Sequence, residues 1–395
     1  MRYASVTDRL AGLGSAKWDV HLRALALREA GRDIIALTIG NPDVPTPPDL
    51  IETATAAMAR GRTQYSNGRG EENLVAALAR RYSASSGRPV TAANVLCFPG
   101  TQTALYAVIM GLAEPGCEVL AGDPMYATYE GIVAASGAAL VPVPLRPEAG
   151  FRIRAEDIAT RITPRSRVIL LNSPHNPTGA VLRAGDIAAI GALARAHELW
   201  LVVDEVYEEL VFDGTLFTSA LSFADLADRV VVVSSISKSH AAPGFRSGWC
   251  IGPAGFTDRV QDLSETMLFG NQPFIADMTA AAVAKPSAVA AGMRTRFARR
   301  ADYLAGRLKG SVLGVHRPEA GMFAMIDVAA TGLDGLGYAL DLLEREGVAV
   351  MPGASFGATL EGWVRVALTV DDATLARACD RIIAHAGAIA ARGAA

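Results

Sequence analysis

One lysine, Lys238, closely follows an apolar, β-branched run that is typical of a buried strand. The run begins at Val231 and breaks into serines at 234, 235 and 237. Arg246 comes eight residues after the lysine, in a Pro-Gly-Phe-Arg turn. Partial desolvation beside such a strand lowers the pKa of an amine and makes it nucleophilic, as Schiff-base chemistry requires. Ser235 and Arg246 would flank this amine with a hydroxyl and a guanidinium, which are ligands for a phosphate. A strand that ends in a solvated Ser/Lys turn is the alternative, and this segment alone leaves both open.

A carboxylate, Asp204, ends a second apolar run. The run at 199–203 leads directly into Asp204-Glu205-Val206-Tyr207. Burial of a carboxylate is costly unless a cation pairs with it, and a protonated pyridinium nitrogen would be such a cation. Tyr207, three residues further on, could donate a hydrogen bond to a phenolic oxygen of the same pyridinium ligand, from the side on which Asp204 lies. A plain helix N-cap is the alternative role for Asp204.

Two other strand-like runs end in groups that suit a phosphorylated aromatic ligand. The turn Pro99–Gln102, which contains Gly100, Thr101 and Gln102, follows one run and opens a helix. Free N–H groups and a hydroxyl at a helix N-terminus form an anion site, although such turns also occur without a ligand. Tyr126 follows another run and could lie flat on a heteroaromatic ring, or pack as an ordinary core tyrosine.

Two positions suit a carboxylate ligand. Arg365 is the one charge in the apolar strand pattern WVRVALT, and a buried guanidinium needs an anion, which its planar fork binds in a bidentate manner. A structural salt bridge is the alternative. Gly40, in the turn Gly-Asn-Pro-Asp, could offer its backbone N–H to a carboxylate with no side chain in the way, or be an ordinary turn glycine.

These residues follow apolar runs that alternate with helical patterns. Continuous apolar runs without in/out alternation indicate strands buried on both faces, and helices between most of them predict a mainly parallel sheet in an α/β sandwich. Ligands bind at the carboxyl ends of such strands, which is where the polar residues fall. The seven predicted strands are 95–98, 118–121, 140–143, 168–172, 199–204, 229–234 and 249–252.

Composition narrows the class of protein. The chain has 395 residues, a net charge of −3 and 19% charged residues, so no bias toward nucleic acid or an anionic membrane is expected. No apolar segment reaches the roughly 18–20 residues that span a bilayer, and the first residues carry charge where a signal peptide has an apolar centre. The four cysteines are far apart with no CxxC pair. Free thiols in the cytoplasm and no metal site are therefore expected.

Taken in chain order, these residues resemble the class I/II pyridoxal-phosphate-dependent aminotransferases of fold type I. The most specific likenesses are NSPHNPTG at 172–179, DEVY at 204–207 and SISKSHAAPGFR at 235–246. The resemblance covers the chain from about Leu37 to Leu368. It implies a large α/β domain, a smaller α+β domain and a homodimer with active sites at the interface.

The resemblance also implies roles around a pyridoxal 5'-phosphate cofactor. Lys238 would be its covalent anchor and the general acid–base, Asp204 would hold the pyridinium proton, and Tyr126 would stack on the ring. Asn176 and Tyr207 would contact its phenolic oxygen. The implied phosphate ligands are Gly100, Thr101, Gln102, Ser235, Arg246 and, reaching across from the neighbouring subunit, Tyr65. The implied ligands of the substrate carboxylate are Gly40, Asn176 and Arg365.

The predicted domain division places an N-terminal arm and small-domain segment at 1–40, a large cofactor-binding domain at 41–285 and a small domain at 286–395. The last boundary lies inside one long helix predicted over 276–308. Its basic face, with Arg294, Arg296, Arg299 and Arg300, is interpreted as solvated.

The predicted reaction moves an amino group from an amino acid to a 2-keto acid. The family's dicarboxylate branches use a lysine at the position of Thr101, or an arginine in a stretch corresponding to 260–276, and this chain has neither. The motifs NSPHNP, SKSHA and GMFAMID are most similar to arginine–pyruvate transaminases, so arginine or another non-dicarboxylic donor with pyruvate is expected. Aspartate or aromatic aminotransferase activity, and a β-lyase or decarboxylase using the same cofactor, are the alternatives.

Overall fold

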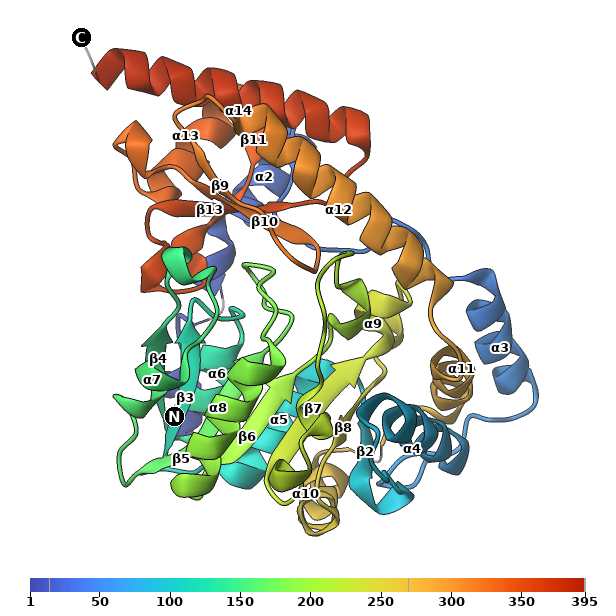
Figure 1. The fold of residues 1–395 in the computed structure, drawn as a ribbon. Coiled ribbons are helices and arrows are strands. Elements are labelled where there is room, and N and C mark those ends of the chain that lie inside the picture. The colour runs from blue at the N-terminus through green and yellow to red at the C-terminus, as the bar shows by residue number, and fades with distance from the viewer. Residues whose placement is uncertain (14, 269, 394–395) are drawn as a thin grey trace.

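The computed structural model describes residues 1–13, 15–268 and 270–393, and a seven-stranded sheet forms its centre (Figure 1). Six of its strands run parallel to one another. The seventh, β8, is antiparallel to both of its neighbours. The predicted α/β class with a mainly parallel seven-stranded sheet is confirmed. In spatial order the strands are β2 (Val95–Phe98), β8 (Gly248–Ile251), β7 (Val230–Ser235), β6 (Trp200–Asp204), β5 (Ser166–Asn172), β3 (Glu118–Asp123) and β4 (Ala139–Pro144).

Both faces of this sheet are buried, which explains the continuous apolar runs. Alternate residues of a strand point to opposite faces, so Val168 and Leu170 of β5 join one core and Ile169 and Leu171 join another. Helices α5, α6 and α10 line the first core, and α4, α8 and α11 line the second. The helices around the sheet are α3 (Pro48–Ala59), α4 (Glu72–Ser86), α5 (Thr101–Leu112), α6 (Tyr129–Ser136), α7 (Ala155–Ala159), α8 (Ala184–Ala196), α9 (Ile236–Ser239), α10 (Ala254–Met267) and α11 (Pro273–Val283).

A smaller α+β unit, here called the small unit, has its own core and is built from both ends of the chain (Figure 1). Its four-stranded antiparallel sheet has the order β12 (Met351–Pro352), β13 (Trp363–Ala367), β10 (Phe323–Asp327) and β9 (Gly314–His316). A parallel pair joins β1 (Ile35–Ala36) to β11 (Val348–Ala349). Its helices are α2 (Asp19–Glu29), α12 (Ala288–Leu308), α13 (Gly335–Glu346) and α14 (Asp372–Gly393), while α1 (Ser5–Leu10) packs on α6.

The single helix predicted over 276–308 is wrong. The chain forms two helices, α11 and α12, separated at 284–287, where Pro286 supplies no backbone N–H for a continuous helix. Ser287 then caps α12, because its side chain accepts a hydrogen bond from the N–H of Ala290.

The solvated face predicted for α12 is also wrong for two of its arginines. The side chain of Arg300 is buried and ion-paired with Asp43 and Asp372, and Arg296 is ion-paired with Asp43. The interpretation failed because Asp43 lies about 250 residues earlier in the chain, beyond any local spacing pattern.

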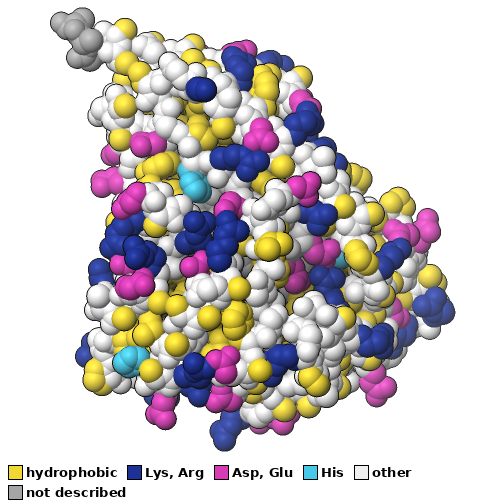
Figure 2. Space-filling view, in the orientation of Figure 1, with side chains coloured by type: hydrophobic (Ala, Val, Ile, Leu, Met, Phe, Trp, Pro, Cys, Tyr) yellow, Lys and Arg dark blue, Asp and Glu magenta, His cyan; other side chains and the backbone are white. Residues whose placement is uncertain are grey.

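Charges of both signs share the surface (Figure 2), and the cysteines lie in the interior. Basic and acidic side chains are interspersed over the face shown in Figure 2. All four cysteines are free and buried, and the described residues contain no group of three or more His, Cys, Asp or Glu side chains that could hold a metal ion. None of the helices within the described ranges combines the length and apolar character needed to cross a membrane.

Substitution of the α12 cap should destabilise the protein. Ser287→Ala removes the cap and also the hydrogen bond that the Ser287 hydroxyl donates to the carbonyl of Ser239 at 2.6 Å. We expect a loss of about 1–2 kcal/mol, measured as a lower urea midpoint of unfolding. Ser287→Thr keeps the hydroxyl and is the matched control; equal midpoints for the alanine variant and wild type would contradict the role of the cap.

Candidate active site

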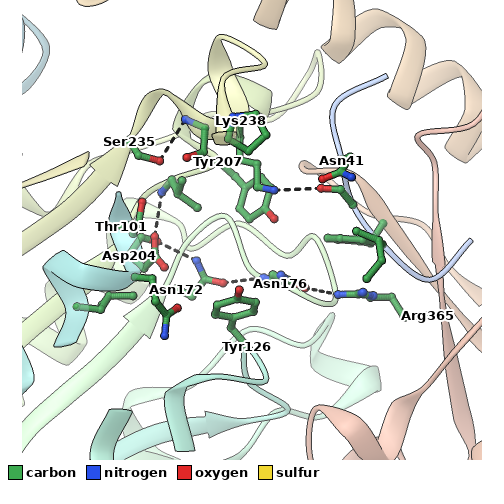
Figure 3. A pocket seen from close by; sticks show the side chains of 18 of the residues that line it. Asn41, Thr101, Tyr126, Asn172, Asn176, Asp204, Tyr207, Ser235, Lys238 and Arg365 are labelled. Carbon is green, nitrogen blue, oxygen red and sulfur yellow. Dashed lines mark hydrogen bonds between the residues drawn. The ribbon is translucent and has the colours of Figure 1, made fainter. Parts of the chain in front are cut away.

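A cavity of about 230 Å³ lies where the carboxyl ends of the large sheet's strands face the small unit (Figure 3). Every site residue predicted from the sequence lines it except Gly100 and Tyr65. Gly100 immediately precedes the lining residue Thr101, at the N-terminus of α5. Tyr65 does not line the cavity in this chain, and its side chain is 91% exposed. The lining residues from the predicted set are Gly40, Thr101, Gln102, Tyr126, Asn176, Asp204, Tyr207, Ser235, Lys238, Arg246 and Arg365.

Lys238 projects into the cavity from the short helix α9, which begins where β7 ends. Ser235 caps this helix by accepting a hydrogen bond from the N–H of Ser237. The Nζ atom donates to the carbonyl oxygen of Gly40 at 3.0 Å. Burial, reinforced by the positive charges of Arg365 and Arg246, lowers the pKa of Lys238 to about 8. About a tenth of the amine is therefore neutral at pH 7.

Asp204 lies at the end of β6 with its carboxylate buried. Its Oδ2 accepts a hydrogen bond from the Tyr129 hydroxyl at 2.9 Å, and its Oδ1 accepts one from the N–H of Val206 at 3.1 Å. Burial raises the pKa of Asp204 to about 6, although these hydrogen bonds oppose the rise. A cationic ligand atom beside this carboxylate would keep it ionised.

Two side chains that support this end of the cavity were not predicted from the sequence. Tyr129 is fully buried beside Asp204, and Asn172 joins Asp204 to the next loop. The Asn172 amide donates to the carbonyl oxygen of Asp204 at 2.9 Å, while its own oxygen accepts from the N–H of Asn176 at 2.7 Å. Their positions at or just after strand ends, in YATYE and in LLNSPHNP, were the available signals.

Arg365 enters the cavity from β13 of the small unit, and its side chain is buried. It donates to the side-chain oxygen of Asn176 at 3.0 Å and to the carbonyl oxygen of Thr38 at 2.7 Å. The rings of Phe323 and Phe356 flank the guanidinium, with centroids at 3.8 and 4.4 Å from its carbon. Its Nε has no partner in the described part of the chain, and no described carboxylate forms a salt bridge with it. Burial lowers the pKa of Arg365 to about 10. This guanidinium is suited to receive an anion, and the alternative of an internal salt bridge does not occur among the described residues.

The opposite end of the cavity presents the groups of an anion site. Gly100 has φ +89°, and a Cβ at this position would overlap the Arg246 guanidinium, so glycine is required for this close approach. Thr101 begins α5, and its buried hydroxyl has no hydrogen-bond partner among the described residues. Ser235 and Arg246 line the same cavity. A helix N-terminus, two hydroxyls and a guanidinium together suit a phosphate.

Aromatic and apolar groups complete the lining. Tyr126 packs edge-to-face on Tyr129, with ring centroids 5.6 Å apart. Gly40 must be a glycine because a Cβ there would overlap the ring of Phe323. Trp18, from a 3-10 helix at Ser15–Trp18, also lines the cavity and was missed in the sequence, where it stood out only as a tryptophan in a polar arm.

Burial of Asp204 should make the cofactor-free protein less stable than its asparagine variant at neutral pH. Its pKa of about 6 lies above 3.8, the value for an unfolded chain, so folding favours the protonated form. The resulting destabilisation is absent below about pH 4, grows as the pH rises from about 4 to 6, and levels off above that at no more than ~3 kcal/mol. Asp204→Asn should therefore raise the melting temperature at pH 7.5 but not at pH 4.

The matched control for this experiment is Asp228→Asn, which neutralises a carboxylate with a largely exposed side chain. Melting curves of the three cofactor-free proteins would be recorded across the pH range. Equal melting temperatures of wild type and Asp204→Asn at pH 7.5 would show that the buried carboxylate carries no such cost.

Comparisons with known proteins agree with this geometry. The family model for aminotransferase class I and II matches residues 32–382. An arginine–pyruvate transaminase of Pseudomonas aeruginosa is 43% identical over 97% of both chains, and an aspartate/prephenate aminotransferase of Thermus thermophilus is 32% identical over 93% of this chain and 94% of the relative.

Solved structures give the same result. A mutant of Thermus thermophilus aspartate aminotransferase superposes with a TM-score of 0.92 at 31% identity, covering 98% of this chain and all of the other. An aromatic aminotransferase from Pyrococcus horikoshii gives 0.87 at 27% identity, covering 94% of this chain and all of the other. The likeness predicted from the motifs is thus confirmed over nearly the whole chain, and the protein belongs to the class I and II aminotransferase family.

Proposed function

We propose that this aminotransferase uses pyridoxal phosphate at the cavity described above to move the amino group of a non-dicarboxylic amino acid, arginine first among the candidates, to pyruvate. The observation that carries the proposal is the arrangement of three charged groups in one cavity. Lys238 lines the same cavity as the buried carboxylate of Asp204 and the buried guanidinium of Arg365, and Arg365 lacks a carboxylate partner among the described residues.

The donor set of the cavity fits this cofactor. The unpartnered Thr101 hydroxyl, the N-terminus of α5, Ser235 and Arg246 would hold the phosphate, with Gly100 and Gln102 shaping that turn. Asp204 would face the ring nitrogen, because its raised pKa requires a cationic partner to stay ionised. When bound, pyridoxal phosphate supplies an electron sink that stabilises negative charge at the α-carbon of an amino acid.

Side chains on the cavity wall would orient the ring. Tyr126 would lie against its face, and the Asn176 amide and Tyr207 hydroxyl would contact its phenolic oxygen. Asn176 and Tyr207 both line the cavity. Burial raises the pKa of Tyr207 well above its ordinary range, so its hydroxyl keeps the proton that it donates.

Lys238 is the proposed covalent anchor and proton carrier. Its pKa of about 8 leaves part of the amine neutral near pH 7, and a neutral Nζ can take up the α-proton of a bound amino acid and return it later. The carbonyl of Gly40 holds Nζ at one side of the cavity. General acid–base work by a lysine needs both properties, a lowered pKa and a fixed position.

Arg365, with Asn176 and Gly40, is the proposed receptor of the substrate carboxylate. The guanidinium is already oriented by Asn176 and Thr38, and its Nε remains available. A carboxylate that binds there gains a charge-assisted bidentate contact without reorganisation of the arginine.

The remaining lining favours a donor with no second carboxylate. The cations that line the cavity within the described ranges are Lys238, Arg246 and Arg365, and each has a role above. Beyond them lie Ile39, Leu105 and Phe323 with the indole of Trp18 and the amides of Asn41 and Gln102. A planar guanidinium suits an indole face and amide oxygens, and the relative at 43% identity is named as an arginine–pyruvate transaminase.

A homodimer, a cytoplasmic location and the division into domains at 41–285 and 286–395 are proposed together with this function. Exposure of Tyr65 supports the dimer, since a tyrosine that serves a neighbouring cofactor phosphate must project from its own subunit. The helix break at 284–287 supports the boundary.

Loading with pyridoxal phosphate followed by borohydride reduction should attach a phosphopyridoxyl group to Lys238, detected by peptide mass spectrometry. Lys238→Ala should lose this attachment and at least 1,000-fold in activity. Lys285→Ala, on the loop between α11 and α12, is the control and should behave as wild type. A label on another lysine, or full activity of Lys238→Ala, would show that the anchor is wrongly assigned.

A screen of amino donors with pyruvate or 2-oxoglutarate tests the substrate. We expect arginine with pyruvate to be the best pair, and Arg365→Lys to lose at least tenfold in kcat/KM because a bidentate contact becomes monodentate. Aspartate or an aromatic amino acid as best donor would select those alternatives. Turnover of a donor to a keto acid and ammonia without any added keto acid would indicate a β-lyase.

A further inference from the structure

We propose that Asp43, held by Arg296 and Arg300 of α12, is a positioning residue that fixes segment 37–46 between the lysine and the carboxylate-binding arginine of the active site. The inference rests on the proposed function for the roles of Lys238 and Arg365. Asp43, Arg296 and Arg300, here called the network, lie outside the cavity lining, and none of the three is expected to touch substrate or cofactor.

Segment 37–46 contacts both catalytic ends of the cavity through its backbone. The carbonyl oxygen of Thr38 accepts from Nη2 of Arg365 at 2.7 Å, and that of Gly40 accepts from Nζ of Lys238 at 3.0 Å. Further on, the hydroxyl of Thr46 donates to the carbonyl of Ala241, three residues after the lysine, at 2.5 Å. One short stretch of chain therefore sets the separation between the amine and the guanidinium.

This segment has little regular structure of its own. The parallel pairing of β1 ends at Ala36, and residues 38–47 belong to no helix or strand. Residues without ladder hydrogen bonds need side-chain anchors to keep one conformation. Asp43 is such an anchor, because its carboxylate is almost fully buried, with a side-chain exposure of 8%.

The anchor consists of ion pairs with good geometry. Arg296 binds both oxygens of Asp43, at 2.9 and 2.8 Å, and Nη1 of Arg300 binds Oδ2 at 2.7 Å. Burial alone would raise the pKa of Asp43, but hydrogen bonds and charge from the two arginines lower it below its ordinary value. The carboxylate is therefore ionised over the working range of an enzyme near neutral pH.

Arg300 extends the anchor to the strand that carries Arg365. Besides Asp43 it binds the carbonyl oxygen of Leu368 at 3.0 Å and Oδ1 of Asp372 at 2.9 Å. Leu368 is three residues after Arg365 and directly follows β13. A shift of Asp43 would thus disturb the guanidinium from two sides, through Thr38 and through Leu368.

Helix α12, which carries Arg296 and Arg300, runs from the small unit to the part of the molecule that contains the large sheet (Figure 1). It packs on α9, the helix of Lys238, and on α14 and β9 of the small unit. Asp43 therefore ties the active-site segment to the element that both parts share.

The test compares Asp43→Asn with Arg299→Gln in the cofactor-loaded enzyme. Arg299 lies on the same helix but is half-exposed and pairs with Asp372 and not with Asp43. We expect Asp43→Asn to raise KM for the amino donor at least tenfold, because carboxylate binding needs the aligned arginine, with a smaller fall in kcat from the loosened contact between Gly40 and Lys238. Hydrogen–deuterium exchange of a peptide covering 37–46 should be at least tenfold faster. Arg299→Gln should leave both unchanged.

The outcomes separate this inference from the proposed function. Wild-type-like KM and exchange in a folded Asp43→Asn enzyme would overturn the inference, as would equal effects of Arg299→Gln. Because Asp43→Asn could unfold the protein, Arg296→Gln, which leaves the Arg300 pair intact, is the second variant and should show the same split in smaller measure. If wild type transaminates no donor, the proposed function fails, and the exchange measurement still decides whether Asp43 fixes the segment.

Discussion

The structure depends on keeping the charged groups Asp204 and Arg365 buried in a cavity where no other described residue forms a salt bridge with them. Asp204 is held by a tyrosine hydroxyl and a backbone N–H, and Arg365 by an amide oxygen, a carbonyl oxygen and two aromatic rings. Neutral dipoles orient these charges but replace only part of the hydration that they lose on burial. The cavity therefore suits ligands that bring a cationic group to Asp204 and an anionic group to Arg365.

The parallel sheet explains how one cavity can collect these groups. Neighbouring strands run in the same direction, so residues at their ends are brought into register: Asn172 of β5 pairs with Asp204 of β6, which pairs with Val233 of β7. Lys238 follows within five residues of that position. The small unit contributes Arg365 from the other side, and segment 37–46 connects the two.

Much of this arrangement could be predicted from the sequence because its signals are local. Apolar β-branched runs gave all seven strands of the large sheet to within two residues at each end, and the polar residues after them line the cavity. Most of what failed was non-local. The pairing of Asp43 with Arg296 and Arg300, and of Tyr129 with Asp204, joins residues far apart in the chain, where no spacing pattern exists. The break between α11 and α12 was local, but the proline that marks it was outweighed by continuous helical periodicity.

The pairing of β1 with β11 has a consequence for biosynthesis. Ile35 pairs with Val348 and Ala36 with Ala349. During synthesis β1 therefore cannot pair with β11 until more than 300 further residues have been made. The strands of the large sheet lie between them and can pair earlier during translation. Segment 37–46, which follows β1 directly, reaches its final place only after this late, long-range closure. A ribosome-bound chain would thus carry a nearly complete sheet while the amine of Lys238 still lacks its carbonyl partner, and catalytic competence would be among the last properties that the nascent protein acquires.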